Sequence, residues 1–120
     1  MSTKTKGQLG EEIACKYLKR LKYEIIERNF KTNVGEIDII CADDGWLVFV
    51  EVKLRYDDEH GRAAQAVNFK KQQKISQVAS QFITKYKKYY APVRFDVIEV
   101  YLGDKTVNHI INAFDSYLRY

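Results

Sequence analysis

Residues 37–53 have the sequence IDIICADDGWLVFVEVK, and the rest of the architecture is organised around them. Two runs rich in β-branched and aromatic residues, 37–41 and 46–53, flank Asp43-Asp44-Gly45. This order is typical of two antiparallel strands joined by a tight turn. Because the second run has apolar residues on both faces, we expect it to be a central strand of a sheet.

The segments on either side predict further strands and two amphipathic helices. Apolar residues at helical spacing predict one helix over residues 6–22 and another that is capped by Asn68 and ends before Pro92. Short β-rich runs predict additional strands over residues 23–28, 95–101 and 107–111. The expected fold is α/β, with element order αβββαββ and a mixed sheet flanked by helices.

The bulk composition favours one soluble domain. The chain has 120 residues, of which 46% are hydrophobic and 30% charged, and it contains no repeat or linker-like segment, so we expect residues 1–120 to form a single domain. Cys15 and Cys41 lie in apolar segments without the spacing of a disulfide framework or a zinc site. No signal peptide or apolar run of membrane-spanning length is present, which predicts a cytoplasmic protein with no membrane partner.

Positive charge is concentrated in one part of the chain. The net charge is +4, but no Asp or Glu occurs between Gly61 and Phe95, where the basic residues are Arg62, Lys70, Lys71, Lys74, Lys85, Lys87, Lys88 and Arg94. A solvated helix face usually mixes both signs, so this segment favours a polyanion such as nucleic acid. The candidate nucleic-acid-binding residues are Arg55, Lys70, Lys71, Gln72 and Lys74, although a solvated position is the simpler interpretation for any one of them alone.

A carboxylate and an ammonium group share one face of the central strand. Because side chains alternate along a strand, Glu51 and Lys53 point to the same side, where burial costs free energy unless they are paired or bind a metal. Asp38 is a second carboxylate inside an apolar run, on the neighbouring strand. Two such carboxylates suit Mg²⁺ or Mn²⁺, and we expect Asp38, Glu51 and the backbone carbonyl of Val52 to be ligands.

Lys53 remains available for chemistry on a phosphate. Beside a metal, its ammonium can orient or help deprotonate a water molecule and offset charge on phosphoryl oxygens. Glu11 lies at the rim of the first helix's apolar stripe and is a fourth candidate, but a carboxylate in a first helical turn also favours the helix dipole. Glu12 points farther outward from the apolar stripe, and we expect it to favour the helix dipole without taking part in chemistry. A salt bridge of Lys53 with Asp38 or Glu51, without metal, is the alternative for the main group.

Other residues receive no chemical role from the sequence. His60 and His109 have no metal-binding spacing partner and are interpreted as surface or strand residues. The nine tyrosines are scattered and form no obvious base-stacking platform. Residues 57–61 are polar and predict an exposed loop beside the site, where loops commonly contact substrate.

Several short motifs resemble one family. They are Gly10-Glu11, Arg28-Asn29, Gly35-Glu36-Ile37-Asp38, Phe49-Val50-Glu51-Val52-Lys53, Lys71-Gln72 and Phe95-Asp96-Val97. From about residue 7 to residue 100 the chain resembles the uncharacterised YraN-type family, which is similar to the restriction-endonuclease-like PD-(D/E)xK superfamily and to archaeal Holliday-junction resolvases. The resemblance implies a restriction-endonuclease-like fold, metal ligation by Asp38 and Glu51, catalysis by Lys53, an accessory acid at Glu11, and auxiliary roles for Lys71 or Gln72.

Two departures from the pattern limit what transfers. The Gly35-Glu36-Ile37-Asp38 motif lacks the superfamily's proline, which does no chemistry, and His60 stands where many relatives have an aromatic residue.

The leading expectation is a Mg²⁺- or Mn²⁺-dependent endonuclease that hydrolyses DNA, with branched or junction DNA in repair or recombination as the favoured substrate. The alternatives are a catalytically inactive nuclease-like module that binds nucleic acid, and a protein-interaction domain whose basic helix binds an acidic surface. The oligomeric state, including a homodimer, stays open.

Overall fold

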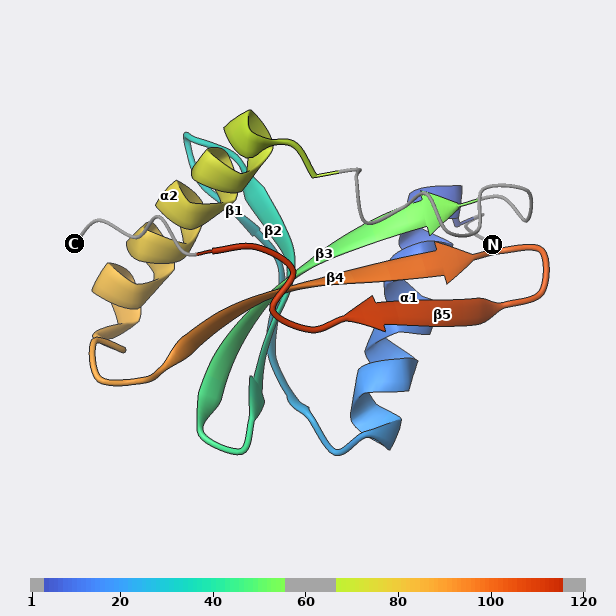
Figure 1. Cartoon of the computed structure of the whole chain (residues 1–120), viewed down its shortest axis with the longest axis horizontal. Helices are drawn as coiled ribbons and strands as arrows, with labels where there is room; N and C mark the ends of the chain where they lie inside the picture. Colours follow the sequence, from blue (N-terminus) through green and yellow to red (C-terminus); the bar gives the residue numbers. More distant parts are fainter. Residues whose placement is uncertain (1–3, 56–66, 116–120) are drawn as a thin grey trace.

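The computed structural model of the protein describes residues 4–55 and 67–115. Its elements are α1 (Lys6–Arg20), β1 (Glu24–Lys31), β2 (Glu36–Asp43), β3 (Trp46–Arg55), α2 (Phe69–Tyr86), β4 (Val93–Tyr101) and β5 (Thr106–Ile110). The strands form one sheet in the order β1-β2-β3-β4-β5. The β3–β4 pair is parallel and the other pairs are antiparallel, so the expected α/β fold with a mixed sheet and αβββαββ order is confirmed (Figure 1).

The β2–β3 hairpin forms at the predicted turn. Asp43 pairs with Trp46, and the two residues between them, Asp44 and Gly45, both have positive φ, at 50° and 87°. This combination is the one that a two-residue hairpin turn matching the twist of the strands requires, and it explains the Asp-Gly sequence. The hairpin therefore fixes the register that aligns the first half of β2 with the middle of β3.

Each helix begins at a side-chain cap. The Thr5 hydroxyl and the Gln8 side chain form a capping box at α1, and the Asn68 side chain accepts a hydrogen bond from the Lys71 amide at α2, as predicted. α2 ends at Lys87, whose φ of 55° is left-handed, well before Pro92. Within residues 4–55 and 67–115, neither helix is both long enough and apolar enough to cross a bilayer.

The two helices cover opposite faces of the twisted sheet (Figure 1). α2 packs over a cluster that includes Phe49 and Phe95, and α1 packs over a cluster that includes Val48 and Val50. Val52 belongs to the α1 side. Strand alternation therefore places Glu51 and Lys53 together on the opposite face, which α2 covers. The sequence predicts that they share a face but not which helix covers it.

Gly10 brings α1 into close contact with the end of β3. A Cβ atom added at Gly10 would lie 2.5 Å from Leu54 Cδ2, so we expect Gly10→Ala to destabilise the protein by about 1–2 kcal/mol, despite the higher helix propensity of alanine. Gly7→Ala is the matched control, because its Cβ would meet only Thr5 Oγ1 at 3.8 Å; it should stabilise by about 0.5 kcal/mol. Urea denaturation measures both. A Gly10→Ala variant as stable as Gly7→Ala would show that the Leu54 side chain moves aside without cost.

Candidate functional site

The site begins where β2 stops pairing with β3. The last paired residues are Ile39 and Val50, and beyond them Asp38 Oδ2 accepts a hydrogen bond from the Val52 amide at 2.8 Å. The Asp38 carboxylate thus accepts the hydrogen bond that a backbone carbonyl would accept in a continued strand pair, and this bond fixes it beside β3. Metal ligation by the Val52 carbonyl stays a prediction.

Glu51 is held by two lysines on the α2 face of the sheet. Its side chain is 10% exposed, and its Oε1 lies 2.9 Å from Lys71 Nζ and 3.8 Å from Lys53 Nζ. Lys71 reaches this position because the Asn68 cap fixes the first turn of α2 over the sheet, with 2.9 Å between Asn68 Oδ1 and the Lys71 amide. The closer ion pair of Glu51 is therefore with Lys71, which the sequence predicts only as an auxiliary residue.

Asp38 is a carboxylate in surroundings that disfavour its charge. Burial, and then the neighbouring charge of Glu51, raise the pKa of Asp38 to about 7. Such a pair holds two negative charges only at a cost, and a divalent cation between them would remove that cost. Within residues 4–55 and 67–115, no group of three or more His, Cys, Asp and Glu side chains is placed to hold a metal, so two carboxylates are what this part of the chain offers. That number fits Mg²⁺ or Mn²⁺, which keep several water ligands.

The two lysines have opposite electrostatic surroundings. Burial, and then the neighbouring ammonium of Lys71, lower the pKa of Lys53. Burial also works against the charge of Lys71, but its contacts with Lys53 and Glu51 outweigh this effect and raise its pKa. Lys71 is therefore the fixed positive charge that neutralises Glu51, and Lys53 is the lysine that gives up a proton more readily.

Glu11 lies at the edge of the site. Its charge contributes to the raised pKa of Asp38, and its Oε1 is 4.0 Å from Arg28 Nη2. The side chain of Glu11 is 18% exposed, in contrast to Glu12, which points away and pairs with Lys4 at 2.6 Å. This placement agrees with the preference for Glu11 over Glu12, although an accessory role for Glu11 stays a prediction.

The start of α2 forms a basic depression next to Glu51. A hollow of about 400 Å³ is lined by Asn68, Lys70, Lys71 and Lys74. The predicted residue Gln72 lies just beside it, but its side-chain amide donates to the Val67 carbonyl at 2.9 Å. Gln72 thus helps to fix the entry into the helix, whereas the three lysines face the hollow.

Arg55 contacts a buried acid that sequence reasoning missed. Its Nε lies 3.6 Å from Glu99 Oε2, and the Glu99 side chain is 1% exposed and accepts a hydrogen bond from Asn108 Nδ2. Glu99 is the β4 partner of Lys53, so this acid extends the polar face of β3 across the sheet. The signal for it is the one that identifies Asp38, a carboxylate inside an apolar strand.

A second polar network lies under α1. Asp96 is fully buried and accepts hydrogen bonds from Arg94 Nε at 2.9 Å and from the Asn112 amide at 3.0 Å, and its Oδ2 lies 2.7 Å from His109 Nε2. The outer members of the network are Tyr17, Tyr23 and Asp43. His109 is a strand residue as predicted, but its side chain is 4% exposed, so a surface position is wrong.

The remaining sequence predictions concern the two cysteines and the polar loop. Cys15 and Cys41 are free and buried, as expected for a chain without a disulfide framework, and burial raises the pKa of the Cys41 thiol to about 12. The loop predicted over residues 57–61, with His60, lies outside the described residues.

Sequence comparison places the chain among proteins of the same size. Residues 10–100 match the family described as "Uncharacterised protein family UPF0102". A UPF0102 protein of Clostridioides difficile is 46% identical over 114 residues, covering 95% of this chain and 100% of the relative. A UPF0102 protein of Caldanaerobacter subterraneus is 47% identical and covers 95% and 98%, and one of Thermodesulfovibrio yellowstonii is 47% identical and covers 90% and 94%. The chain therefore belongs to the UPF0102 family.

Proposed function

We propose that the protein is a metal-dependent endonuclease that hydrolyses phosphodiester bonds of DNA, with branched or junction DNA as its favoured substrate. The observation that carries the proposal is the placement of Asp38 beside Glu51, where burial and then the charge of Glu51 raise the pKa of Asp38 to about 7. A fold gains nothing from such a pair unless a cation or a reaction uses it. The resemblance of these residues to the PD-(D/E)xK superfamily supports the same assignment.

Each residue at the site has a distinct role in this proposal. Asp38 and Glu51 would hold Mg²⁺ or Mn²⁺, which when bound polarises a phosphate and makes water more acidic. Asp38 keeps its orientation because the Val52 amide binds its Oδ2. Lys53, whose Nζ lies 3.8 Å from Glu51 Oε1, would orient the attacking water and offset the charge that builds on the phosphoryl oxygens. Lys70, Lys71 and Lys74 contact phosphates of the DNA backbone at the hollow beside Glu51.

Cleavage of defined nucleic acids tests the proposal. Linear, single-stranded and four-way branched DNA, together with RNA, are incubated with the purified protein and Mg²⁺, Mn²⁺ or EDTA. We expect cleavage that needs a divalent cation and is fastest on the branched substrate. An Asp38→Asn variant purified in parallel controls for contaminating nuclease. Absence of cleavage on every substrate, or cleavage that persists in Asp38→Asn, would overturn the proposal.

One observation favours a second candidate, a nuclease-like module that binds nucleic acid without cutting it. Lys71 Nζ already lies 2.9 Å from Glu51 Oε1, so a built-in cation occupies the carboxylate. Calorimetric titration with Mg²⁺ and Mn²⁺ separates the two candidates. No detectable divalent-ion binding, combined with salt-sensitive DNA binding, would favour the module over the enzyme.

Lys53 and Lys71 should behave differently when their charge is removed. We expect Lys53→Met to lower the cleavage rate by about 100-fold while leaving the dissociation constant for Mg²⁺ nearly unchanged, because Lys53 acts on water and phosphate. Lys71→Met should instead tighten Mg²⁺ binding, because it removes the ammonium that competes for Glu51. Calorimetry and single-turnover cleavage measure the two effects. Identical behaviour of the two variants would contradict this division of roles.

A further inference from the structure

One side of α2 is lined by basic and neutral polar residues from end to end. The members recur every three or four positions, which is the spacing of one helical face: Lys70, Lys74, Gln77, Gln81 and Lys85. No Asp or Glu occurs anywhere between residues 67 and 95. The face begins at the hollow beside Glu51, so it leads directly away from the candidate active site.

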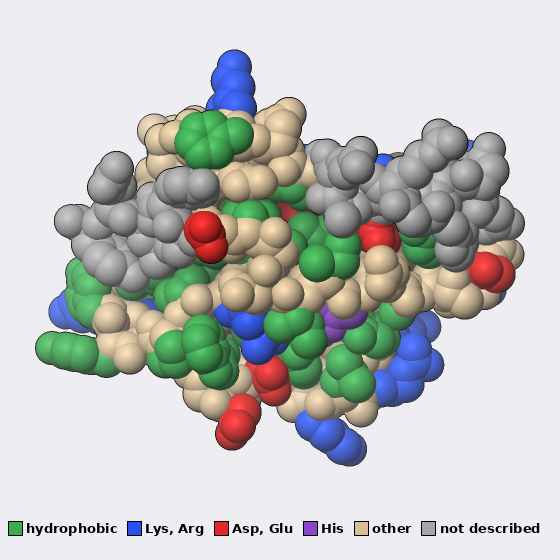
Figure 2. Space-filling model, in the orientation of Figure 1, with side chains coloured by type: hydrophobic (Ala, Val, Ile, Leu, Met, Phe, Trp, Pro, Cys, Tyr) green, Lys and Arg blue, Asp and Glu red, His purple; other side chains and the backbone are tan. Residues whose placement is uncertain are grey.

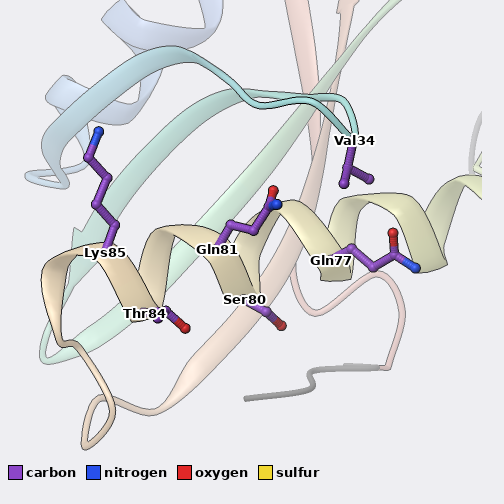
Figure 3. A pocket seen from close by; sticks show the side chains of 6 residues that line it. All are labelled: Val34, Gln77, Ser80, Gln81, Thr84 and Lys85. Atoms are coloured by element: carbon purple, nitrogen blue, oxygen red, sulfur yellow. The ribbon is translucent and has the colours of Figure 1, made fainter.

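The middle of this face is hollowed. A groove of about 460 Å³ is lined by Val34, Gln77, Ser80, Gln81, Thr84 and Lys85 (Figure 3). Gln81 Nε2 donates to Asn33 Oδ1 at 3.2 Å, whereas Gln81 Oε1 is buried without a hydrogen-bond partner among the described residues. The amide side chains of Gln77 and Gln81 line a groove without acids, and after a change of rotamer they can exchange hydrogen bonds with a nucleobase.

The far end of α2 exposes aromatic rings among lysines. Tyr86, Tyr89 and Tyr90 are 43%, 46% and 99% exposed, and they alternate with Lys85, Lys87 and Lys88. The left-handed conformation of Lys87 ends the helix and turns the chain there. Figure 2 shows Lys or Arg side chains and hydrophobic side chains projecting together at this end, and a Lys or Arg side chain over the opposite end of α2. The Tyr86 ring also packs on Phe82, with 4.7 Å between the ring centroids, whereas Tyr90 is almost fully exposed. Exposed rings of this kind suit base stacking next to phosphate-binding cations.

We propose that α2 is a track for a single-stranded nucleic acid, which runs from the candidate active site to a stacking platform formed by Tyr86, Tyr89 and Tyr90. This inference rests on the proposed function and narrows the substrate to DNA with an unpaired arm. The basic residues along α2 complement the negative charge of the phosphates, which supports binding along the whole track. A duplex fits less well, because paired bases present no free faces to the tyrosine rings. The 18 residues of α2 span about 27 Å, which is about eight nucleotides at the stacked spacing of about 3.4 Å.

Binding of labelled oligodeoxythymidine in EDTA tests the track without any cleavage. Anisotropy titrations compare strands of about 4 and about 16 nucleotides. We expect Tyr90→Ala to weaken binding of the long strand at least about fivefold, to leave the short strand unaffected, and to be rescued by Tyr90→Phe. Leu21→Ala is the matched control, since Leu21 is 46% exposed at the end of α1.

Salt dependence tests the charged part of the track. Lys85→Ala should make the slope of log affinity against log salt shallower by about 0.7 for the long strand, as expected for one lost phosphate contact. Lys19→Ala, an exposed lysine of α1, should leave the slope unchanged. Equal slopes for the two variants, or long-strand binding that Tyr90→Ala leaves intact, would overturn the track.

Cleavage of tailed duplexes in Mn²⁺ separates failure of the track from failure of the proposed function. Substrates with single-stranded tails of about 4 and about 16 nucleotides are compared, and the track predicts faster cleavage with the long tail, an advantage that Tyr90→Ala removes. Equal cleavage of both substrates by both proteins would overturn the track and leave the endonuclease standing. No cleavage, with Tyr90-dependent binding of the long strand, would overturn the endonuclease and support the track as a binding surface.

Discussion

Glu51→Gln is expected to lower the Mg²⁺-dependent cleavage rate by about a thousandfold. The substitution keeps the size of a side chain that is only 10% exposed, but it removes the carboxylate charge that Asp38, Lys53 and Lys71 all face. Metal affinity should fall together with the rate. Single-turnover assays at saturating enzyme, combined with calorimetric Mg²⁺ titration, measure both quantities.

Glu12→Gln is the matched control for this substitution. Glu12 lies one residue from Glu11, but it is paired with Lys4 on the outer side of α1, so its loss should leave cleavage unchanged. Thermal unfolding of both variants tests whether they are folded. A folded Glu51→Gln protein that cuts DNA at the wild-type rate would show that the reaction takes place elsewhere or in a contaminant.

Asp96→Asn is expected to have the largest effect on stability, a loss of about 3–5 kcal/mol in the free energy of unfolding. Asp96 is fully buried, and its carboxylate receives hydrogen bonds from Arg94 and from the Asn112 amide and contacts His109. Removing its charge leaves the Arg94 guanidinium in a half-buried position without its bidentate partner. Urea denaturation at neutral pH measures the loss, and Asp115→Asn, at an exposed position, is the control.

The same network predicts how stability depends on pH. Burial opposes ionisation of Asp96, but the contacts with His109, Arg94 and the Asn112 amide together outweigh it and lower the pKa below the usual 3.8. The stability from this carboxylate is therefore present above the pKa of the unfolded chain, and it is lost as the pH falls from about 3.8 through the lower pKa of the folded state. Wild type should lose stability in this window more steeply than Asp96→Asn. Parallel curves would contradict the assignment.

The local parts of the fold and of the candidate site could be predicted from the sequence. Asp44-Gly45 specifies the hairpin turn, and strand alternation is enough to place Glu51 and Lys53 on one face with Asp38 on the neighbouring strand. These inferences concern residues that are close in the chain. There the spacing of apolar residues and the types of turn residue determine the local structure.

Contacts between distant segments could not be predicted in the same way. Lys71 lies on Glu51 only because α2 crosses the sheet at that point, and helical periodicity does not fix this crossing. Asp96 carries the same signal as Asp38, but its partner His109 comes from another strand. The exposure of Tyr86, Tyr89 and Tyr90 where α2 ends at the left-handed residue Lys87 could not be predicted from the sequence either, since it depends on how the helix packs against the sheet.

The single parallel pair in the sheet, β3 with β4, has a consequence for the order of folding. β1, β2 and β3 are joined by short turns and pair with neighbours in the chain, whereas β3 and β4, which pair with each other, are separated in the sequence by the segment that contains α2. Local hairpins form sooner than contacts of long sequence separation. We therefore expect Asp38 and Glu51 to be brought together early, while still in contact with water, and Lys71 to arrive later with α2. The free-energy cost of burying the two carboxylates then arises late in folding, when α2 docks on the sheet. This cost should therefore increase the unfolding rate, and it should leave the rate at which β1, β2 and β3 first pair almost unchanged.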